Sequence, residues 1–184
     1  AAEIVVLRAY AKYLRQMGFP LSQAFVEATL VANADIAADL VALFKARFDP
    51  EAQAGGDDDA EARTRAVETA LEAVDNLSED RVLRQLLALI LATTRTNFWR
   101  RDAEGRARSF LSFKFDPAKV PGLPEPRPMF EIFVYSPRFE GVHLRGGRVA
   151  RGGLRWSDRP EDFRTEVLGL VKAQMLKNTV IVPV

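Results

Sequence analysis

The feature that most limits the fold is a change in hydrophobic period near Arg100. Before it, apolar residues recur at helical spacing, and Leu7 and Leu14 fall on one face of a first helix. After it, residues 110–115 and 129–135 are short, aromatic-rich runs with partial alternation, as in β-strands. Helices followed by strands indicate an α+β or α/β fold in which helices cover a sheet.

Residues 1–100 are expected to form a helical segment. Gly18-Phe19-Pro20 breaks the first helix, and Ser22 is positioned to cap the next one. A further break is expected near Asn33-Ala34-Asp35. An acidic stretch near 50–60, with Gly55-Gly56 followed by three aspartates, is predicted to be a flexible loop. It lacks the ligand spacing of a calcium loop. The predicted helices cover residues 7–17, 22–48, 60–76 and 78–99.

Residues 101–184 are expected to form a sheet unit with a hairpin and a crossover helix. Two β-prone runs, 142–145 and 148–151, flank Gly146-Gly147, and this pattern predicts a tight hairpin. A helix is expected from Pro160 to Asn178, begun by Asp158 and Glu161 as a capping box. The β-branched run 179–182 predicts a last strand.

Residue usage excludes several classes of protein. The chain has no cysteine, so disulfides, thiol catalysis and cysteine metal sites are excluded. Its one histidine, His143, rules out a multi-histidine metal centre and is expected to be structural or partly exposed. No apolar run approaches the ~20 residues of a membrane span, and no signal peptide is visible. These features favour a cytoplasmic protein.

Charge is unevenly distributed along the chain. Residues 138–177 hold nine Lys or Arg against five Asp or Glu, a local net charge of +4, which leaves −3 for the remainder. The basic surplus coincides with the glycine pairs and indicates an anionic partner there. It is too small to imply nucleic acid. The two Arg-Gly-Gly triplets occur in some RNA-binding tails, but here they lie between apolar runs without interleaved aromatics.

The turn that begins Arg151-Gly152-Gly153 is the first candidate binding element. Paired glycines let the backbone approach a ligand closely, and an arginine can bind a carboxylate through two parallel hydrogen bonds. The alternative is an ordinary glycine turn with solvated arginines.

The end of the helix that follows is the second candidate element. Gln174 and Lys177 are three residues apart and can face one point. A lysine there can clamp a substrate carboxylate, or it can simply complement the negative end of the helix. Gly169 and Ala173 form a smooth strip suited to packing on a strand.

Together these residues resemble a known family, the large bacterial NAD-specific glutamate dehydrogenases. The resemblance rests on residues 140–147 (EGVHLRGG), 151–172 (RGGLRWSDRPEDFRTEVLGLVK) and 174–178 (QMLKN), and in the helical part on 7–16 (LRAYAKYLRQ) and 91–97 (LATTRTN). It covers most of the chain, and the long C-terminal motif is highly specific.

The resemblance implies a role for each candidate residue. Arg151 corresponds to a substrate-contacting lysine of the smaller glutamate dehydrogenases; arginine keeps the charge and changes the geometry, so the carboxylate it meets stays open. Gly152 and Gly153 would line the site, and Gln174 and Lys177 would hold the substrate's carboxylates. Residues 101–184 would then be the beginning of the catalytic, substrate-binding domain.

The resemblance also implies what lies elsewhere in the parent protein. That protein would oxidatively deaminate L-glutamate to 2-oxoglutarate and ammonia with NAD, as a homo-oligomer. The catalytic lysine and the NAD domain would lie outside this chain, which contains no G-x-G-x-x-G, so the fragment alone is expected to be inactive. The alternative is a structural, oligomerisation or regulatory module of a larger enzyme.

Overall fold

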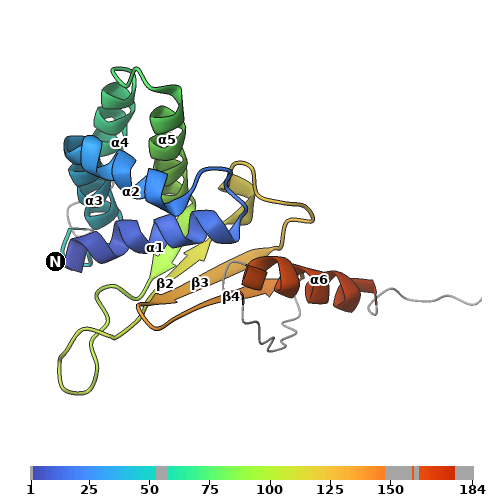
Figure 1. The fold of residues 1–184 in the computed structure, drawn as a ribbon. Coiled ribbons are helices and arrows are strands. Elements are labelled where there is room, and N and C mark those ends of the chain that lie inside the picture. The colour runs from blue at the N-terminus through green and yellow to red at the C-terminus, as the bar shows by residue number, and fades with distance from the viewer. Residues whose placement is uncertain (1, 53–57, 148–158, 160–161, 177–184) are drawn as a thin grey trace, which may run out of the picture.

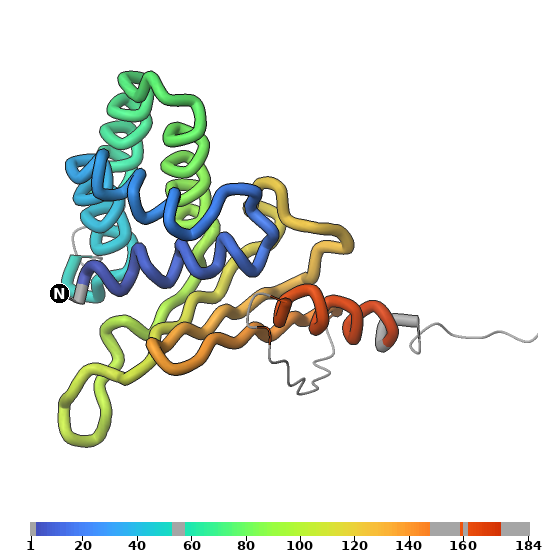
Figure 2. Tube along the Cα trace, in the orientation of Figure 1, coloured from blue at the N-terminus to red at the C-terminus, as the bar shows by residue number. Residues whose placement is uncertain are grey.

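Helices come first and an antiparallel sheet follows in this computed structural model, which describes residues 2–52, 58–147, 159 and 162–176 (Figures 1 and 2). The helices are α1 (Ala2–Gln16), α2 (Gln23–Ala32), α3 (Ala34–Phe48), α4 (Asp58–Leu71), α5 (Leu77–Ala92) and α6 (Phe163–Leu176). The strands are β1 (Thr93–Thr96), β2 (Leu111–Phe115), β3 (Phe130–Ser136) and β4 (Phe139–Arg145), with a 3₁₀ turn, η2, at Pro117–Lys119. The predicted mixture of helix and sheet is confirmed.

The sheet follows the order of the chain, β1-β2-β3-β4, and every neighbouring pair is antiparallel. Phe113 of β2 lies opposite Phe133 of β3, which in turn lies opposite Val142 of β4. Because helices and strands are segregated along the chain and the strands are antiparallel, the fold is α+β, the first of the two predicted classes.

The breaks between the first three helices lie where they were predicted from the sequence. The side chain of Ser22 accepts a hydrogen bond of 3.2 Å from the backbone N–H of Phe25, so Ser22 caps α2 as predicted. Asn33 separates α2 from α3, and its side chain donates to the carbonyl of Thr29 and to Glu79 of α5.

The helix predicted over 78–99 is too long. α5 ends at Ala92, and Thr93–Thr96 form β1 instead of a last helical turn. Thr93 is buried, its hydroxyl donates to the carbonyl of Leu89 and lies 2.8 Å from the hydroxyl of Tyr10. Three β-branched threonines favour an extended backbone, and pairing with β2 decides the conformation.

The acidic stretch is only in part what was predicted. Asp58 and Asp59 belong to the first turn of α4, where carboxylates stabilise the positive end of the helix dipole. Residues 53–57 lie outside the described residues.

The hairpin observed in the sheet joins β3 to β4 through Pro137 and Arg138. The run 142–145 is a strand, as predicted, and its observed partner is β3. The second arm of the hairpin predicted at Gly146-Gly147, residues 148–151, and the strand predicted over 179–182 both lie outside the described residues.

The main core joins buried residues of α1 to α5 with one face of the sheet, and α1 packs on the strands (Figure 1). Tyr10 stacks on Phe113 with ring centroids 4.1 Å apart, and Tyr13 stacks on Phe115 at 4.4 Å. Phe44 of α3 meets Tyr10 edge to face. Aromatic pairs of this kind add ~0.5–1.5 kcal/mol each beyond the area they bury, so they fix how α1 crosses the strands.

Candidate functional site

The predicted substrate residues fall at the edge of the described structure. Gln174 lies in the last turns of α6, whose backbone extends to Leu176. Arg151, Gly152, Gly153 and Lys177 lie outside the described residues. What the structure does show is how α6, the helix that carries Gln174, is held against the rest of the fold.

A buried ion pair fixes the beginning of α6. The guanidinium of Arg164 donates two hydrogen bonds to the carboxylate of Glu131 in β3, at 2.8 and 2.9 Å. The two side chains are 1% and 0% exposed. This fork geometry satisfies both carboxylate oxygens and is the strong form of such a pair.

Helix α1 completes the surroundings of this ion pair. The hydroxyl of Tyr13 donates a hydrogen bond of 2.7 Å to Glu131. The side-chain oxygen of Gln16 accepts from the backbone N–H of Arg164 at 3.1 Å, and its amide nitrogen donates to Glu140 of β4 at 3.0 Å. We call Tyr13, Gln16, Glu131, Glu140 and Arg164 the buried polar cluster.

The charges of the cluster support one another. Burial alone would lower the pKa of Arg164, but the hydrogen bonds and the charge of Glu131 outweigh it and raise that pKa, so the guanidinium stays charged. Burial, with Glu131 close by, raises the pKa of Tyr13 well above its ordinary value, so the phenol remains a donor. The cluster is thus a fixed set of paired groups that holds α6 in place.

Apolar contacts fix the remainder of α6 on β4. Leu168 and Val171 pack with Leu144, and Val167 lies against them. The predicted Gly169–Ala173 strip does not make this contact: both residues are exposed, and a side chain at Gly169 would meet nothing within 4 Å. The prediction was wrong because the larger branched residues Leu168 and Val171 supply more apolar area to bury.

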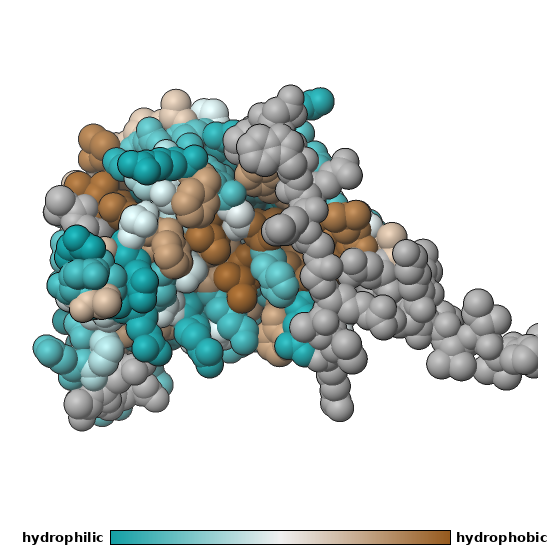
Figure 3. All heavy atoms as spheres, turned by 90° about the horizontal axis from the view of Figure 1, so that it is seen from below, coloured by the Kyte–Doolittle hydropathy of each residue, from teal (hydrophilic) through white to brown (hydrophobic). Residues whose placement is uncertain are grey.

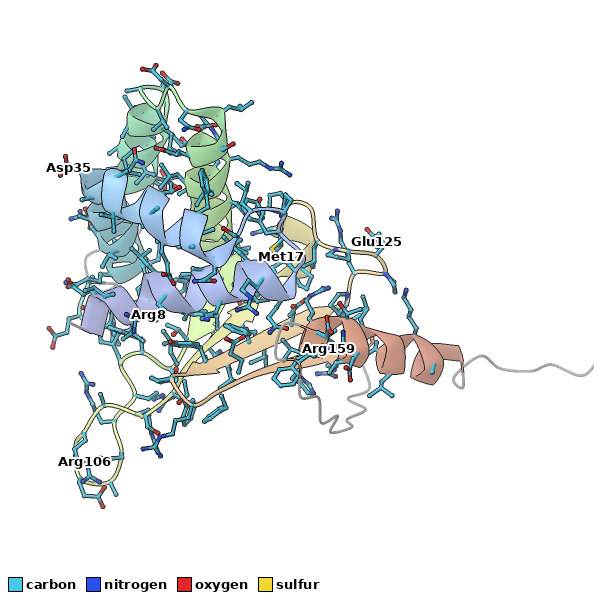
Figure 4. The ribbon with its side chains drawn as sticks, viewed as in Figure 1. Arg8, Met17, Asp35, Arg106, Glu125 and Arg159 are labelled. Atoms are coloured by element: carbon cyan, nitrogen blue, oxygen red, sulfur yellow. The ribbon has the colours of Figure 1, made fainter. Side chains whose placement is uncertain are left out.

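In Figure 4, which has the orientation of Figure 1, Arg159, shortly before α6, lies below Met17, which directly follows α1. From Arg164 to Gln174 the helix rises ~15 Å at ~1.5 Å per residue. The buried polar cluster at the beginning of α6 therefore fixes the direction of this helix, whose last turns contain Gln174.

Sequence reasoning missed the buried polar cluster. Glu131 is the signal that could have found it, because it shares an inward-facing position with Phe133 and Tyr135 in an otherwise apolar strand. A buried carboxylate requires a cation. Its partner in the structure is Arg164, 33 residues later.

Three observations on the described residues concern other kinds of site. His143 is exposed on β4, which agrees with the second of the two alternatives expected for it, a structural or a partly exposed histidine. Among the described residues, no three acidic or histidine side chains gather as metal ligands would. Likewise, no helix in the described ranges is long and apolar enough to cross a membrane.

Comparison with known proteins gives matches along nearly the whole chain. Residues 66–184 match the catalytic domain of bacterial NAD-glutamate dehydrogenase, and residues 1–50 match helical motif 3 of glutamate dehydrogenase. The chain is 56% identical over 181 residues to the NAD-specific glutamate dehydrogenase of Halomonas elongata and 55% identical over 185 residues to that of Pseudomonas aeruginosa. It is 53% identical over 184 residues to that of Mycobacterium tuberculosis.

These alignments cover 98%, 99% and 99% of the chain but only 11% of each relative. The chain thus corresponds to a small part of a much longer polypeptide in all three bacteria. With a family model over residues 66–184 and identities above one half along nearly its whole length, the chain belongs to the family of bacterial NAD-glutamate dehydrogenases.

Proposed function

We propose that the parent polypeptide oxidatively deaminates L-glutamate to 2-oxoglutarate and ammonia with NAD. We also propose that this chain supplies part of the substrate-binding site. Family membership is the observation that carries the proposal. From the resemblance to the family, the proposed substrate contacts are Arg151, Gly152, Gly153, Gln174 and Lys177. The proposed setting is a homo-oligomer in the cytoplasm.

Each proposed substrate residue has a physical role. Arg151 and Lys177 would bind carboxylates of glutamate through charge-assisted hydrogen bonds, and Gln174 would donate an amide N–H to the same substrate. Gly152 and Gly153 would let the backbone approach the ligand without a Cβ in the way. The backbone of Gln174 belongs to α6, as its proposed place on a helix requires.

The described residues do not fit a dinucleotide site of the Rossmann type. The described sheet is antiparallel, whereas the Rossmann unit needs parallel strands with a glycine-rich turn, and the chain has no G-x-G-x-x-G. NAD would supply the hydride acceptor of the reaction. We therefore propose that NAD is bound by a part of the parent outside these 184 residues, together with the catalytic lysine.

The proposal is tested by assaying the full-length protein for NADH formation at 340 nm. We expect formation with L-glutamate and NAD, and none from the 184-residue chain alone under the same conditions. L-Alanine and D-glutamate serve as controls for the substrate. Equal rates with L-glutamate and L-alanine, or no turnover by the full-length protein, would contradict the proposed reaction.

A second candidate is a structural or oligomerisation role for the helical half. Val31 at the end of α2 and Leu77 at the start of α5 are large apolar residues with 79% and 81% exposure. The Asn33–Glu79 hydrogen bond of 2.9 Å brings these two helix ends together. If they form a subunit contact, the paired substitution Val31→Asp and Leu77→Asp will reduce the oligomer mass measured by light scattering. An unchanged mass would remove this role from that surface.

A further inference from the structure

Strand β3 is apolar on both of its faces. Phe133 and Tyr135 are buried on the side that faces α1, and the alternate residues Phe130, Ile132 and Val134 point to the opposite side and are half-buried. A sheet with one face in water normally alternates apolar and polar residues, whereas strands apolar on both faces occur where both faces are covered. The second face of this sheet therefore has the composition of a covered surface.

No described helix covers that face. α1 packs on the face that carries Phe115 and Phe133, and α6 packs on Leu144, which lies opposite the inward-facing Glu131. Figure 3 views the molecule from below, and hydrophobic atoms lie among hydrophilic ones in the middle of this side. We call Arg95, Lys114, Phe130, Ile132, Val134 and Arg145 the outer face of the sheet.

The outer face carries three cations. Arg95 and Lys114 lie directly opposite each other on β1 and β2, and like charges in that position repel. The ammonium of Lys114 lies 4.5 Å from the ring centre of Phe130, and the guanidinium carbon of Arg145 lies 5.6 Å from the same ring. Within the described residues, none of the three forms an ion pair.

A depression of about 380 Å³ opens beside two of these cations, Arg95 and Lys114. Its lining includes Arg95, Lys114 and Phe130 together with Met129, which is 43% exposed. One carboxylate also lines it, that of Asp116, but this group accepts a hydrogen bond from the backbone of Ala118 and caps η2. The surface is thus an apolar floor with a net positive rim.

We propose that an acidic, amphipathic segment of the same polypeptide, outside these 184 residues, docks on the outer face of the sheet. Its apolar side would cover Ile132 and Val134, and its carboxylates would meet Arg95, Lys114 and Arg145. The argument for this contact does not depend on the proposed substrate site.

Two observations favour this occupant: the charge of the neighbouring residues and the length of the polypeptide in the relatives. The neighbouring segment of this chain, residues 148–158, has three arginines and one aspartate, which is the wrong charge for a basic surface. In the relatives, the aligned region is 11% of the polypeptide, so most of the sequence lies elsewhere in the same molecule. A tethered segment reaches effective concentrations of ~mM, which favours it over a separate molecule.

The first test is zero-length cross-linking of the full-length protein with a carbodiimide. The reagent activates a carboxylate, the amine of Lys114 displaces it to form an amide, and the reagent leaves as a urea. We expect Lys114 to be joined to an Asp or Glu peptide outside this region. In a mixture of ¹⁴N- and ¹⁵N-labelled protein, the linked peptides should carry a single label. The exposed Lys119 is the matched control and should not join that peptide.

The second test uses the sign of a stability change. If an acidic segment covers the face, Lys114→Glu places like charges together, and the thermal midpoint of the full-length protein should fall. Lys114→Arg and Lys119→Glu should leave it unchanged. Lys114→Gln loses the same contact with the ring of Phe130 without adding a negative charge, so on an open face Lys114→Glu would have the midpoint of Lys114→Gln or a higher one, because it attracts Arg95.

Several results would overturn the proposal. Mixed-label links would assign the face to a second subunit, and a link to Asp116 alone would show that no other carboxylate is near Lys114. A midpoint of Lys114→Glu equal to or above that of Lys114→Gln would show an open face. All of these outcomes are independent of glutamate turnover, so failure here is distinguishable from failure of the proposed reaction.

Discussion

Replacing Lys177 by alanine in the full-length enzyme is expected to lower kcat/KM for L-glutamate by about 10- to 150-fold. A hydrogen bond to a charged group contributes ~1.5–3 kcal/mol, and each ~1.4 kcal/mol corresponds to a factor of ten. The measurement is the initial rate of NADH formation over a range of glutamate concentrations.

Lys172→Ala is the matched control for this variant. Lys172 lies on α6 and is exposed, so its loss should leave kcat/KM unchanged. L-Norvaline, which lacks the side-chain carboxylate of glutamate, identifies the group that Lys177 binds. If the loss persists with norvaline, Lys177 meets the α-carboxylate; if it vanishes, Lys177 meets the side-chain carboxylate. An unchanged kcat/KM for glutamate would remove Lys177 from the substrate site.

The second large effect is expected at the buried polar cluster. Glu131→Gln leaves the guanidinium of Arg164 buried without its counter-charge, and breaking such a pair costs ~3–5 kcal/mol. The loss should be local to α6 and β3. Hydrogen exchange of peptides from these two elements, measured in the full-length protein, should show strongly reduced protection.

Two comparisons separate the charge effect from general damage. Glu104 and Arg106 also form an ion pair of 2.9 Å, but their side chains are 61% and 72% exposed, so Glu104→Gln should change exchange very little. The double variant Glu131→Leu with Arg164→Leu removes both charges and should recover part of the protection. Equal effects of Glu131→Gln and Glu104→Gln would mean that the buried pair does not hold α6.

The sequence predicted the elements better than their ends. Helical spacing located α1, α2, α3 and α5, and Ser22 and Asn33 marked boundaries correctly. The end of α5 was missed because Thr93–Thr96 becomes a strand only through pairing with Leu111–Phe115, which no local pattern reveals. Asp58 and Asp59 were assigned to a loop because acidic residues suit both a loop and a helix start.

The candidate site was predicted from a motif, and the geometry that supports it was not. Gln174 could be placed on a helix by spacing alone. The pairing of Glu131 with Arg164, and the approach of Tyr13 from 118 residues away, depend on how the chain closes in space. Sequence spacing carries information about neighbours on one element, and the buried polar cluster joins α1, β3, β4 and α6.

The separation of Glu131 and Arg164 along the chain has a consequence for synthesis on the ribosome. Glu131 is made 33 residues before the arginine that neutralises it, an interval of about 2–7 s at typical elongation rates. During that interval, closing the core over the carboxylate would bury an unpaired charge. We therefore expect α1 and β3 of the nascent chain to stay apart until Arg164 has emerged, which makes the arrival of α6 the step that completes the folding of this region.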